Sequence, residues 1–224
     1  MAEAWRRVKV WDGWVRLFHW ALMALVAASW GTAQTGNWRL HFLSGYSILA
    51  LLGFRILWGF LGSDTARFGR FLRSPVVVAR YLGGIFKRGP DTEPGHNPAG
   101  GWMVALMLAL LLAQVGTGLF ADPDDYVVRG PFAARIDSAT SYAVAGWHFR
   151  LFNVILAVVA LHVLAILAYR LIKRHDLLAP MLTGRKRMPP EAPAPRIASP
   201  LLGAVLFALA AGAAYALSRF GAAP

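Results

Sequence analysis

The stretch WHFRLFNVILAVVALHVLAIL, residues 147–167, decides the fold of this chain. It is almost entirely apolar over a length close to the roughly 20 residues that cross a bilayer as a helix. An open sheet would leave backbone groups unpaired in lipid, so we expect a membrane-spanning helix here. His148 and His162 interrupt the apolar run, fourteen residues apart. That spacing corresponds to about 21 Å of helix and leaves the two side chains within roughly 40° of one face.

The composition assigns the whole chain to the membrane class. Of its 224 residues, 57% are hydrophobic and 15% are charged, whereas soluble domains contain about 45–50% and about 25% of these classes. A water-soluble enzyme and a disordered tail are therefore excluded. The chain contains no cysteine, which excludes disulfides, thiolate nucleophiles, iron–sulfur clusters, cysteine-ligated zinc and c-type haem attachment.

Five apolar stretches predict five membrane-spanning helices, over approximately residues 14–33, 40–60, 102–121, 147–172 and 200–220. We therefore expect an all-α integral membrane protein, in which a four-helix transmembrane bundle is followed by a fifth, C-terminal transmembrane helix. The predicted parts are a transmembrane domain over 1–187, a proline-rich cytoplasmic linker over 188–199 and the C-terminal helix over 200–224.

The distribution of charge predicts the orientation. The net charge is +12, and the basic residues gather in three alternate segments: Arg6, Arg7, Lys9 and Arg16; Arg67, Arg70, Arg73, Arg80, Lys87 and Arg88; Lys173, Arg174, Arg185, Lys186, Arg187 and Arg196. Cytoplasmic loops are enriched in Lys and Arg, so we expect a cytoplasmic N-terminus and a C-terminus outside. Because these residues are scattered between spans and form no compact basic domain, membrane lipid is an expected partner and nucleic acid is not.

One cytoplasmic loop and one outer loop have distinctive compositions. Arginines alternate with aromatic and apolar residues over 65–88, which predicts a helix lying in the membrane interface. The outer loop after the third span contains four aspartates: Asp122, Asp124, Asp125 and Asp137. They form either a solvated loop or a surface for a basic partner such as a c-type cytochrome.

Four of the six histidines lie in or at the ends of the predicted spans. Ionisable residues inside a membrane are costly and usually functional. With the predicted orientation, His41 lies at the outer level with His148, and His19 lies at the inner level with His162. Two facing imidazoles at each of two depths match two bis-histidine haems, because haem iron takes axial imidazoles and helix bundles build cofactor sites from facing helices.

Other uses of these four histidines are less well matched. Zinc would need a third or fourth ligand at each level, and a proton relay usually adds carboxylates within the membrane; the spans contain neither. The alternatives that remain are a haem-free, histidine-based transporter or proton channel, and an anchor subunit whose sites have decayed.

Arginines close to the two levels are candidate partners for haem propionates through charge-assisted hydrogen bonds. Arg55 follows His41 by fourteen residues and so lies at the inner level, and Arg16 precedes His19 by about one turn. Arg39 and Arg150 lie near the outer pair. Snorkelling to lipid headgroups is the alternative role of Arg16 and Arg39.

Glycines near the same levels would let a large planar cofactor approach the backbone. Gly45 lies one turn after His41, and Gly116 and Gly118 lie in the third span, which has no histidine. Close packing of helices is the alternative role of all three glycines.

The ordered set of motifs resembles the bacterial cytochrome b561 family, in particular the branch containing the cytochrome b subunit of nickel-iron hydrogenases. The motifs are KVWDGWVRLFHW, LHFLSGY, LLGFRILWGF, GHNPAGGWM, WHFRLFNVILAVVALH and MLTGRKR, within residues 8–187. The resemblance implies a four-helix bundle that holds b-type haem in the bacterial inner membrane. It also implies the same ligands: His19, His41, His148 and His162. The proline-rich linker and the fifth span depart from the family pattern.

The resemblance further implies transmembrane electron transfer in a respiratory chain. The expected function is to link a periplasmic redox partner, either a c-type cytochrome or a hydrogenase-like protein, to the quinone pool, with quinone as the substrate. A quinol oxidoreductase acting on a small oxidant such as superoxide is the alternative. The sequence does not separate an electron-transfer subunit from a quinone-linked enzyme. It also leaves open the direction of flow, the partner, the quinone type and the oligomeric state.

The two remaining histidines lie in cytoplasmic loops. His96 opens HNPAGGW, and it either belongs to a turn that caps the third span or exchanges protons with a quinone near the inner haem. His175 is interpreted as an interfacial residue without a special role.

Overall fold

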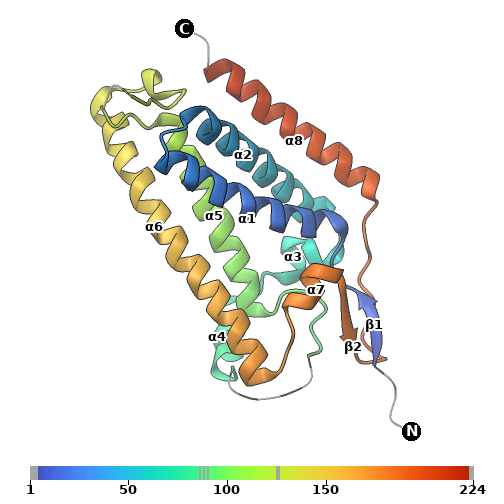
Figure 1. The fold of residues 1–224 in the computed structure, drawn as a ribbon. Coiled ribbons are helices and arrows are strands. Elements are labelled where there is room, and N and C mark those ends of the chain that lie inside the picture. Colours follow the sequence, from blue (N-terminus) through green and yellow to red (C-terminus); the bar gives the residue numbers. More distant parts are fainter. Residues whose placement is uncertain (1–4, 86, 88, 90, 125–126, 222–224) are drawn as a thin grey trace. The chain divides into compact units, whose positions relative to one another are not determined.

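The structure is a computed structural model that describes residues 5–85, 87, 89, 91–124 and 127–221. Of the loop residues named above, Arg88 and Asp125 lie outside these ranges. The described chain is mostly helical (Figure 1). Its elements are β1 (Arg6–Lys9), α1 (Gly13–Gln34), α2 (Trp38–Leu61), η1 (Asp64–Ala66), α3 (Phe68–Phe71), α4 (Pro75–Gly83), α5 (Pro98–Phe120), η2 (Ala133–Arg135), α6 (Ser138–Ala168), the π-helical turn η3 (Tyr169–Lys173), α7 (Leu178–Thr183), β2 (Arg185–Met188) and α8 (Pro200–Gly221).

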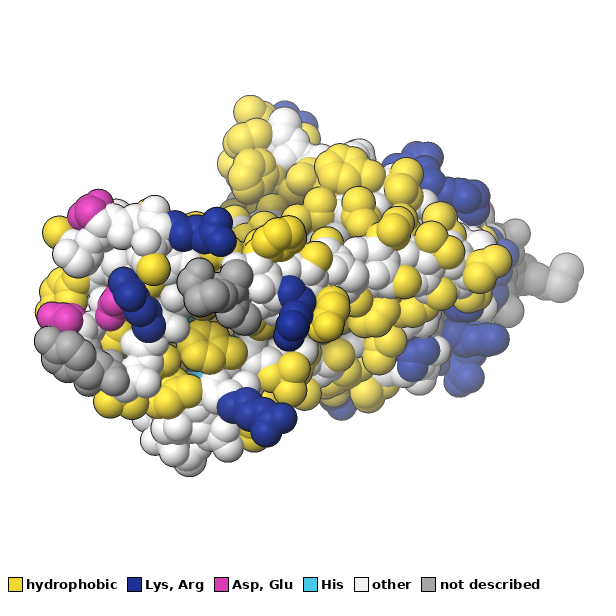
Figure 2. All heavy atoms as spheres, turned by 90° about the horizontal axis from the view of Figure 1, so that it is seen from above, with side chains coloured by type: hydrophobic (Ala, Val, Ile, Leu, Met, Phe, Trp, Pro, Cys, Tyr) yellow, Lys and Arg dark blue, Asp and Glu magenta, His cyan; other side chains and the backbone are white. Residues whose placement is uncertain are grey.

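Four helices in the described part of the chain are long and apolar enough to cross a membrane. They are α2, α5, α6 with its π-helical turn, and α8. Many large apolar side chains on these helices are exposed, among them Phe149 and Leu164, which are 63% and 62% accessible. Figure 2 shows hydrophobic side chains over much of the face that it presents. Such continuous apolar surface is unusual on a soluble monomer and is expected where lipid covers it.

The expected first span is a helix, α1, but it is not one of these four candidates. Its 22 residues correspond to about 33 Å, enough to cross the hydrocarbon core. Arg16, His19, Ser29, Thr32 and Gln34 lower its hydropathy. A fifth span is therefore not confirmed, and α1 crossing the membrane becomes part of the proposal below.

Two predicted helical segments differ from the structure. Helix α6 begins at Ser138, nine residues before the predicted span, because Asp137 accepts a hydrogen bond from the Thr140 backbone amide and caps the helix. Hydrogen bonds from the Thr140 side chain and then from its backbone amide lower the pKa of Asp137. Instead of one interfacial helix, the 65–88 segment forms the short helices α3 and α4, and Pro75 begins the second of them.

The chain forms two compact units. The first comprises Met1–His19, Arg55–Leu106 and Ala160–Leu206, and the second comprises Trp20–Phe54, Met107–Val159 and Phe207–Pro224. Each long helix contributes residues to both units, and each unit is described by itself.

In the first unit, β1 and β2 form an antiparallel ribbon (Figure 1). Val8 of β1 and Met188 of β2 are buried. The Val10 and Trp11 amides donate to the Gly184 carbonyl at 2.9 and 3.1 Å. Gly184 has φ +78°, and a Cβ there would lie 2.8 Å from the Trp11 carbonyl oxygen. Only glycine fits this tight turn between α7 and β2 without strain.

The proline-rich segment after β2 is extended, and its backbone binds the segment that follows α2. The Ala198 amide donates to Ser63 Oγ and the Arg196 amide donates to an Asp64 carboxylate oxygen, both at 3.0 Å. At the start of α8, Trp14 Nε1 donates to the Pro200 carbonyl at 2.9 Å. This chain of bonds fixes where α8 begins.

In the second unit, α8 packs on α2. Phe54 and Phe207 meet edge to face with ring centroids 5.9 Å apart. A Cβ on Gly53 would lie 3.5 Å from the Ala210 Cβ. Small residues at such contacts let helix backbones approach closely.

The contact between Trp14 and α8 generates a test of how α8 is held. A Cβ at Gly203 would overlap the Trp14 indole ring, whereas a Cβ at Gly212 meets nothing within 4 Å. We expect Gly203→Ala to lower the free energy of unfolding by about 1–3 kcal/mol through overpacking. Gly212→Ala should leave stability unchanged or raise it by up to about 1 kcal/mol through helix propensity. Thermal unfolding in detergent, followed by circular dichroism, compares the two variants. Equal midpoints would contradict the packing described.

Candidate haem sites

In the second unit, His41 and His148 lie together beside a cavity. Their ring centroids are 6.3 Å apart and their planes are nearly perpendicular, at 87°. The cavity has a volume of about 610 Å³, within the range of about 300–1,000 Å³ that is typical of ligand pockets. Both histidines and Gly45 line it, among mostly apolar and aromatic neighbours. The predicted outer pair is thus brought together next to a space of cofactor size.

Hydrogen bonds fix the tautomer of both imidazoles. His41 Nδ1 lies 2.9 Å from the Ser29 carbonyl oxygen, and His148 Nδ1 lies 2.9 Å from the Gln114 carbonyl oxygen. A carbonyl can only accept, so Nδ1 carries the proton in each ring. In a neutral imidazole Nε2 then keeps its lone pair. A metal-binding histidine is usually oriented by this kind of bond from its other ring nitrogen.

Helix α5 supplies the surroundings of His148. Thr117 Oγ1 lies 3.3 Å from His148 Nδ1, and the Gln114 amide nitrogen lies 3.3 Å from His148 Nε2. The buried Gln114 Oε1 has no hydrogen-bond partner among the described residues. The Gln114 amide therefore holds its position by weak contacts only, and moving it away from Nε2 would cost little.

The glycines of this unit serve different purposes. A Cβ on Gly118 would lie 2.8 Å from His148 Cε1, so the His148 ring needs a glycine at this position. Gly45 and Gly116 have open space where a Cβ would be. Gly45 therefore leaves room beside His41, as a large planar group would need.

In the first unit, His19, His162 and His96 belong to one electrostatic cluster with Arg55. The charge of His162 acts on His19, and the charges of Arg55, His162 and His19 act on His96. Both His19 and His162 are half-buried. The predicted inner pair thus lies in one cluster, together with a third histidine that the sequence places only in a loop.

Arg55 is a buried cation with an incomplete set of partners. It is 3% accessible and lies over the rings of Phe68 and Phe71, 5.2 and 5.9 Å from their centroids. Its Nη1 has no hydrogen-bond partner, and no ion pair within 4.0 Å involves it among the described residues. A buried charge left this way is costly, so an anionic group of a cofactor would fit here.

Asp12 attracts Arg55 but is engaged elsewhere. It is 3% accessible, accepts the Val15 amide at 2.8 Å and thereby caps α1. Its other oxygen accepts Trp58 Nε1 at 3.1 Å. Sequence reasoning missed Asp12, although an aspartate directly before a predicted helix is a capping signal.

Two of the other three candidate arginines, Arg16 and Arg150, contact other parts of the protein. Arg16 donates hydrogen bonds to the Met181 and Leu182 carbonyls at the end of α7. Arg150 is exposed on α6 and lies over the Trp147 ring at 5.5 Å. The spacing places both residues at a level of their helix but does not determine which groups their side chains contact.

The loop histidines are both built into the first unit. His96 packs between Trp11 and Phe71, each 4.8 Å away between ring centroids. Burial, followed by the charge of Arg55, lowers the pKa of His96 to about 3, so the ring is neutral at physiological pH. The adjacent Asn97 accepts the Gly100 amide at 2.8 Å and caps α5. The neutral ring and this cap fit the structural role better than proton exchange.

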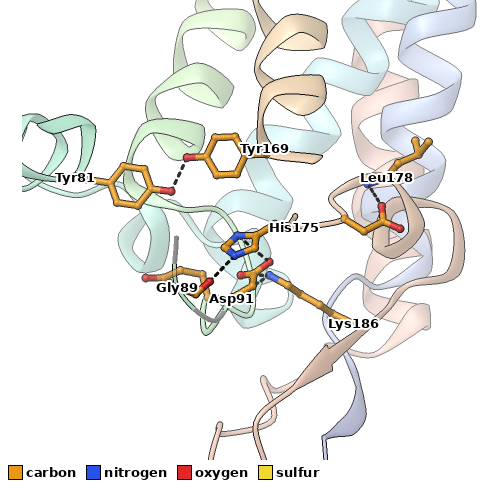
Figure 3. Close-up of polar contacts among 9 residues, drawn as sticks. Tyr81, Gly89, Asp91, Tyr169, His175, Leu178 and Lys186 are labelled. Carbon is orange, nitrogen blue, oxygen red and sulfur yellow. Dashed lines mark hydrogen bonds and ion pairs between the residues drawn. The ribbon is translucent and has the colours of Figure 1, made fainter. Parts of the chain in front are cut away.

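His175 takes part in a polar network that the sequence did not reveal (Figure 3). Its Nε2 donates to the Gly89 carbonyl at 2.8 Å, and its Nδ1 lies 3.7 Å from Asp91. Lys186 Nζ contacts the same carboxylate at 2.6 Å. The network holds the loop before α5 against β2 and the segment after α6.

Next to this network, Tyr81 and Tyr169 share a hydroxyl hydrogen bond of 2.5 Å (Figure 3). Burial and this bond raise the pKa of Tyr81. Tyr169 begins the π-helical turn, a local irregularity that places its ring beside α4.

A match to a family model identifies the family of this chain. The family model described as prokaryotic cytochrome b561 matches residues 10–184. The chain belongs to the prokaryotic cytochrome b561 family. No curated protein and no solved structure matches it. Membership of the b561 family implies haem b binding and electron transfer in a membrane, and the four apolar helices agree with a membrane cytochrome.

The residues present fit haem. Each histidine pair offers two ligands, as axial coordination requires, and no group of three or more His, Cys, Asp or Glu side chains in the described ranges is placed to hold a metal ion. The cavity of the second unit and the incompletely paired Arg55 of the first unit add a space for the macrocycle and a partner for a propionate.

The glycine contact on His148 gives a sharp test of the second-unit site. Gly118→Ala should push the His148 ring from its position and reduce the haem content of the purified protein. Gly116→Ala in the same helix should not, because Gly116 does not line the cavity and its Cβ meets no other atom within 4 Å. Both changes should leave helix content intact, since alanine favours helix over glycine. Haem absorbance per chain measures the difference, and equal haem content in the two variants would argue against His148 as a ligand.

Proposed function

We propose that this protein is a di-haem cytochrome b that carries electrons across the bacterial inner membrane between a periplasmic redox partner and the quinone pool. The observation that carries the proposal is the pair His41 and His148, 6.3 Å apart beside a cavity of about 610 Å³. His41 and His148 would hold the iron of one haem between them, and the cavity beside them would receive the macrocycle.

His41 and His148 are the proposed ligands of the outer haem, and His19 and His162 those of the inner haem. Bound haem supplies one-electron redox chemistry by cycling its iron between two oxidation states. The Ser29 and Gln114 carbonyls accept hydrogen bonds from Nδ1 of the two outer imidazoles and so orient both rings. Arg55 is proposed to bind a propionate of the inner haem through Nη1.

The proposed topology has five spans, including α1, with the N-terminus in the cytoplasm and the C-terminus in the periplasm. Support for α1 comes from its length and from its role: it bears His19, and its Ser29 orients His41. Polar residues within a span are tolerated where they face a bundle interior or a cofactor. The basic segments at alternate chain positions support the orientation.

The first measurement is a reduced-minus-oxidised visible spectrum with a pyridine haemochrome count per chain. We expect two b haems. His148→Ala should lose the outer haem and His162→Ala the inner one, because each removes one of two axial ligands. One haem per chain would show that one pair is structural, and the variants would identify it. No haem, in cells with adequate haem supply, would contradict the cytochrome function.

A second assay tests the link to quinone separately. Oxidation of one quinol releases two electrons and two protons, which suffices to reduce two one-electron haems. We expect a short-chain quinol to reduce the haem bands of the oxidised protein, or the matching quinone to reoxidise the reduced protein, depending on the potentials. Stopped-flow absorbance measures both. If neither reaction occurs while the haem count stays at two, the quinone link is wrong and haem binding stands.

A further inference from the structure

The β-ribbon of the first unit has one face made only of cations. The register pairs Arg7 directly with Arg187 and Lys9 directly with Arg185. Alternate residues of a strand share a face, so these four side chains project from the same side. All four are exposed. Like charges directly opposite one another destabilise a ribbon, and here the ribbon contains two such pairs.

The opposite face of the same ribbon is organised differently. Val8 and Met188 are buried there, Lys186 pairs with Asp91 at 2.6 Å, and Arg6 donates to the Ala192 carbonyl at 2.5 Å. Every cation on the packed face therefore has a partner. Among the ion pairs of the described residues, none involves Arg7, Lys9, Arg185 or Arg187.

The cationic face is held in place by its attachments. The Gly184 carbonyl accepts two amides next to β1, and Thr65 Oγ1 donates to the Val10 carbonyl at 2.6 Å. A fixed array of charges loses less conformational freedom on binding than a flexible basic tail does. Arginines presented this way also match phosphate, whose oxygens accept paired N–H bonds.

The attachment to Thr65 places the ribbon close to a membrane-spanning candidate. Val10 directly follows Lys9, and Thr65 lies four residues after the end of α2. Four residues extend at most about 14 Å, so the ribbon is attached near the end of a helix that is long and apolar enough to cross a membrane. Long Lys and Arg side chains near such a helix end can extend toward the lipid headgroups, where an anionic leaflet attracts them.

We propose that the face formed by Arg7, Lys9, Arg185 and Arg187 binds the phosphate groups of anionic phospholipids at the membrane surface. The bound lipid supplies the negative charge that the two like-charge pairs require. This site is separate from both candidate haem sites and does not depend on haem or quinone binding.

The test uses the full-length protein purified in an uncharged detergent. Phosphatidylglycerol is titrated in, and bound lipid per chain is measured by native mass spectrometry, with phosphatidylcholine as the neutral lipid. R7Q/R187Q removes one cross-strand pair, and R135Q/R219Q is a control with the same change of charge at exposed positions of the second unit. We expect the affinity for phosphatidylglycerol to fall about 30-fold in R7Q/R187Q, from about fivefold for each arginine, and to stay unchanged in the control.

Unfolding measurements separate binding from a merely structural role. In uncharged detergent alone, R7Q/R187Q should unfold at the same temperature as the wild type or higher, because a repulsive pair is gone. Added phosphatidylglycerol should raise Tm more in the wild type than in this variant. A lower Tm of the variant in detergent alone would assign the pair a structural role and overturn the proposal.

Three further outcomes would overturn the lipid assignment. Unchanged phosphatidylglycerol binding in R7Q/R187Q would exclude this face as the site. Full displacement of the lipid by inorganic phosphate at matched concentration would assign the face to a free anion. Tighter binding to a polyglutamate peptide than to phosphatidylglycerol would assign it to an acidic protein partner.

Discussion

The bond from an imidazole N–H to a backbone carbonyl is the interaction on which the second-unit site depends. Within an apolar helix, an imidazole that lacks a partner is costly, and His41 and His148 meet this requirement through Ser29 and Gln114. Those carbonyls come from two other helices, so the same two bonds hold α1 to α2 and α5 to α6. They also decide which ring nitrogen keeps a lone pair. The contact between helices and the orientation of both imidazoles therefore depend on one kind of bond. The position of the His148 ring also requires glycine at position 118, because the ring occupies the volume that a side chain would fill there.

Arginines of this chain take different roles according to burial. Arg55 is buried and its Nη1 has no hydrogen-bond partner among the described residues, so a group that enters the protein interior could complete its bonds. Arg16 is partly covered and binds helix-end carbonyls, which carry the negative end of the helix dipole. Arg7 and Arg187 are outside, where a soluble or membrane-bound anion can reach them. All of these arginines carry the same positive charge, and the burial of each one determines which hydrogen-bond acceptor or anion can reach it.

The sequence predicts what depends on periodicity and length. The spacing of His148 and His162 and the apolar stretches identified the long helices and the histidines that come together. It could not predict the β-ribbon, because RRVK and RKRM are short, charged segments that pair only through contacts some 180 residues apart in sequence. The contacts of Arg150 and His175 could not be predicted from the sequence either. Sequence spacing gives the level of a side chain along a helix, whereas the packing of the folded chain determines which groups it contacts. Asp12 could have been found from its position before α1. The early start of α6 could likewise have been read from Asp137.

The segment after residue 184, beyond the family match, is connected to the family core by specific contacts. The last strand pairs with β1, which also lies outside the match, whereas the extended linker binds Ser63 and Asp64 within it and α8 packs against α2 through Phe207. Helix α2 bears both His41 and Arg55, one residue from each candidate site. An added helix that packs on α2 therefore supports the element common to both sites, and the linker fixes the residues directly after its end. The part of α8 that packs on α2 is apolar, with Phe207 and Ala210 at the contact. The most direct role for this extension is to hold α2 in position, which leaves the histidine and arginine chemistry to the helices within the family match.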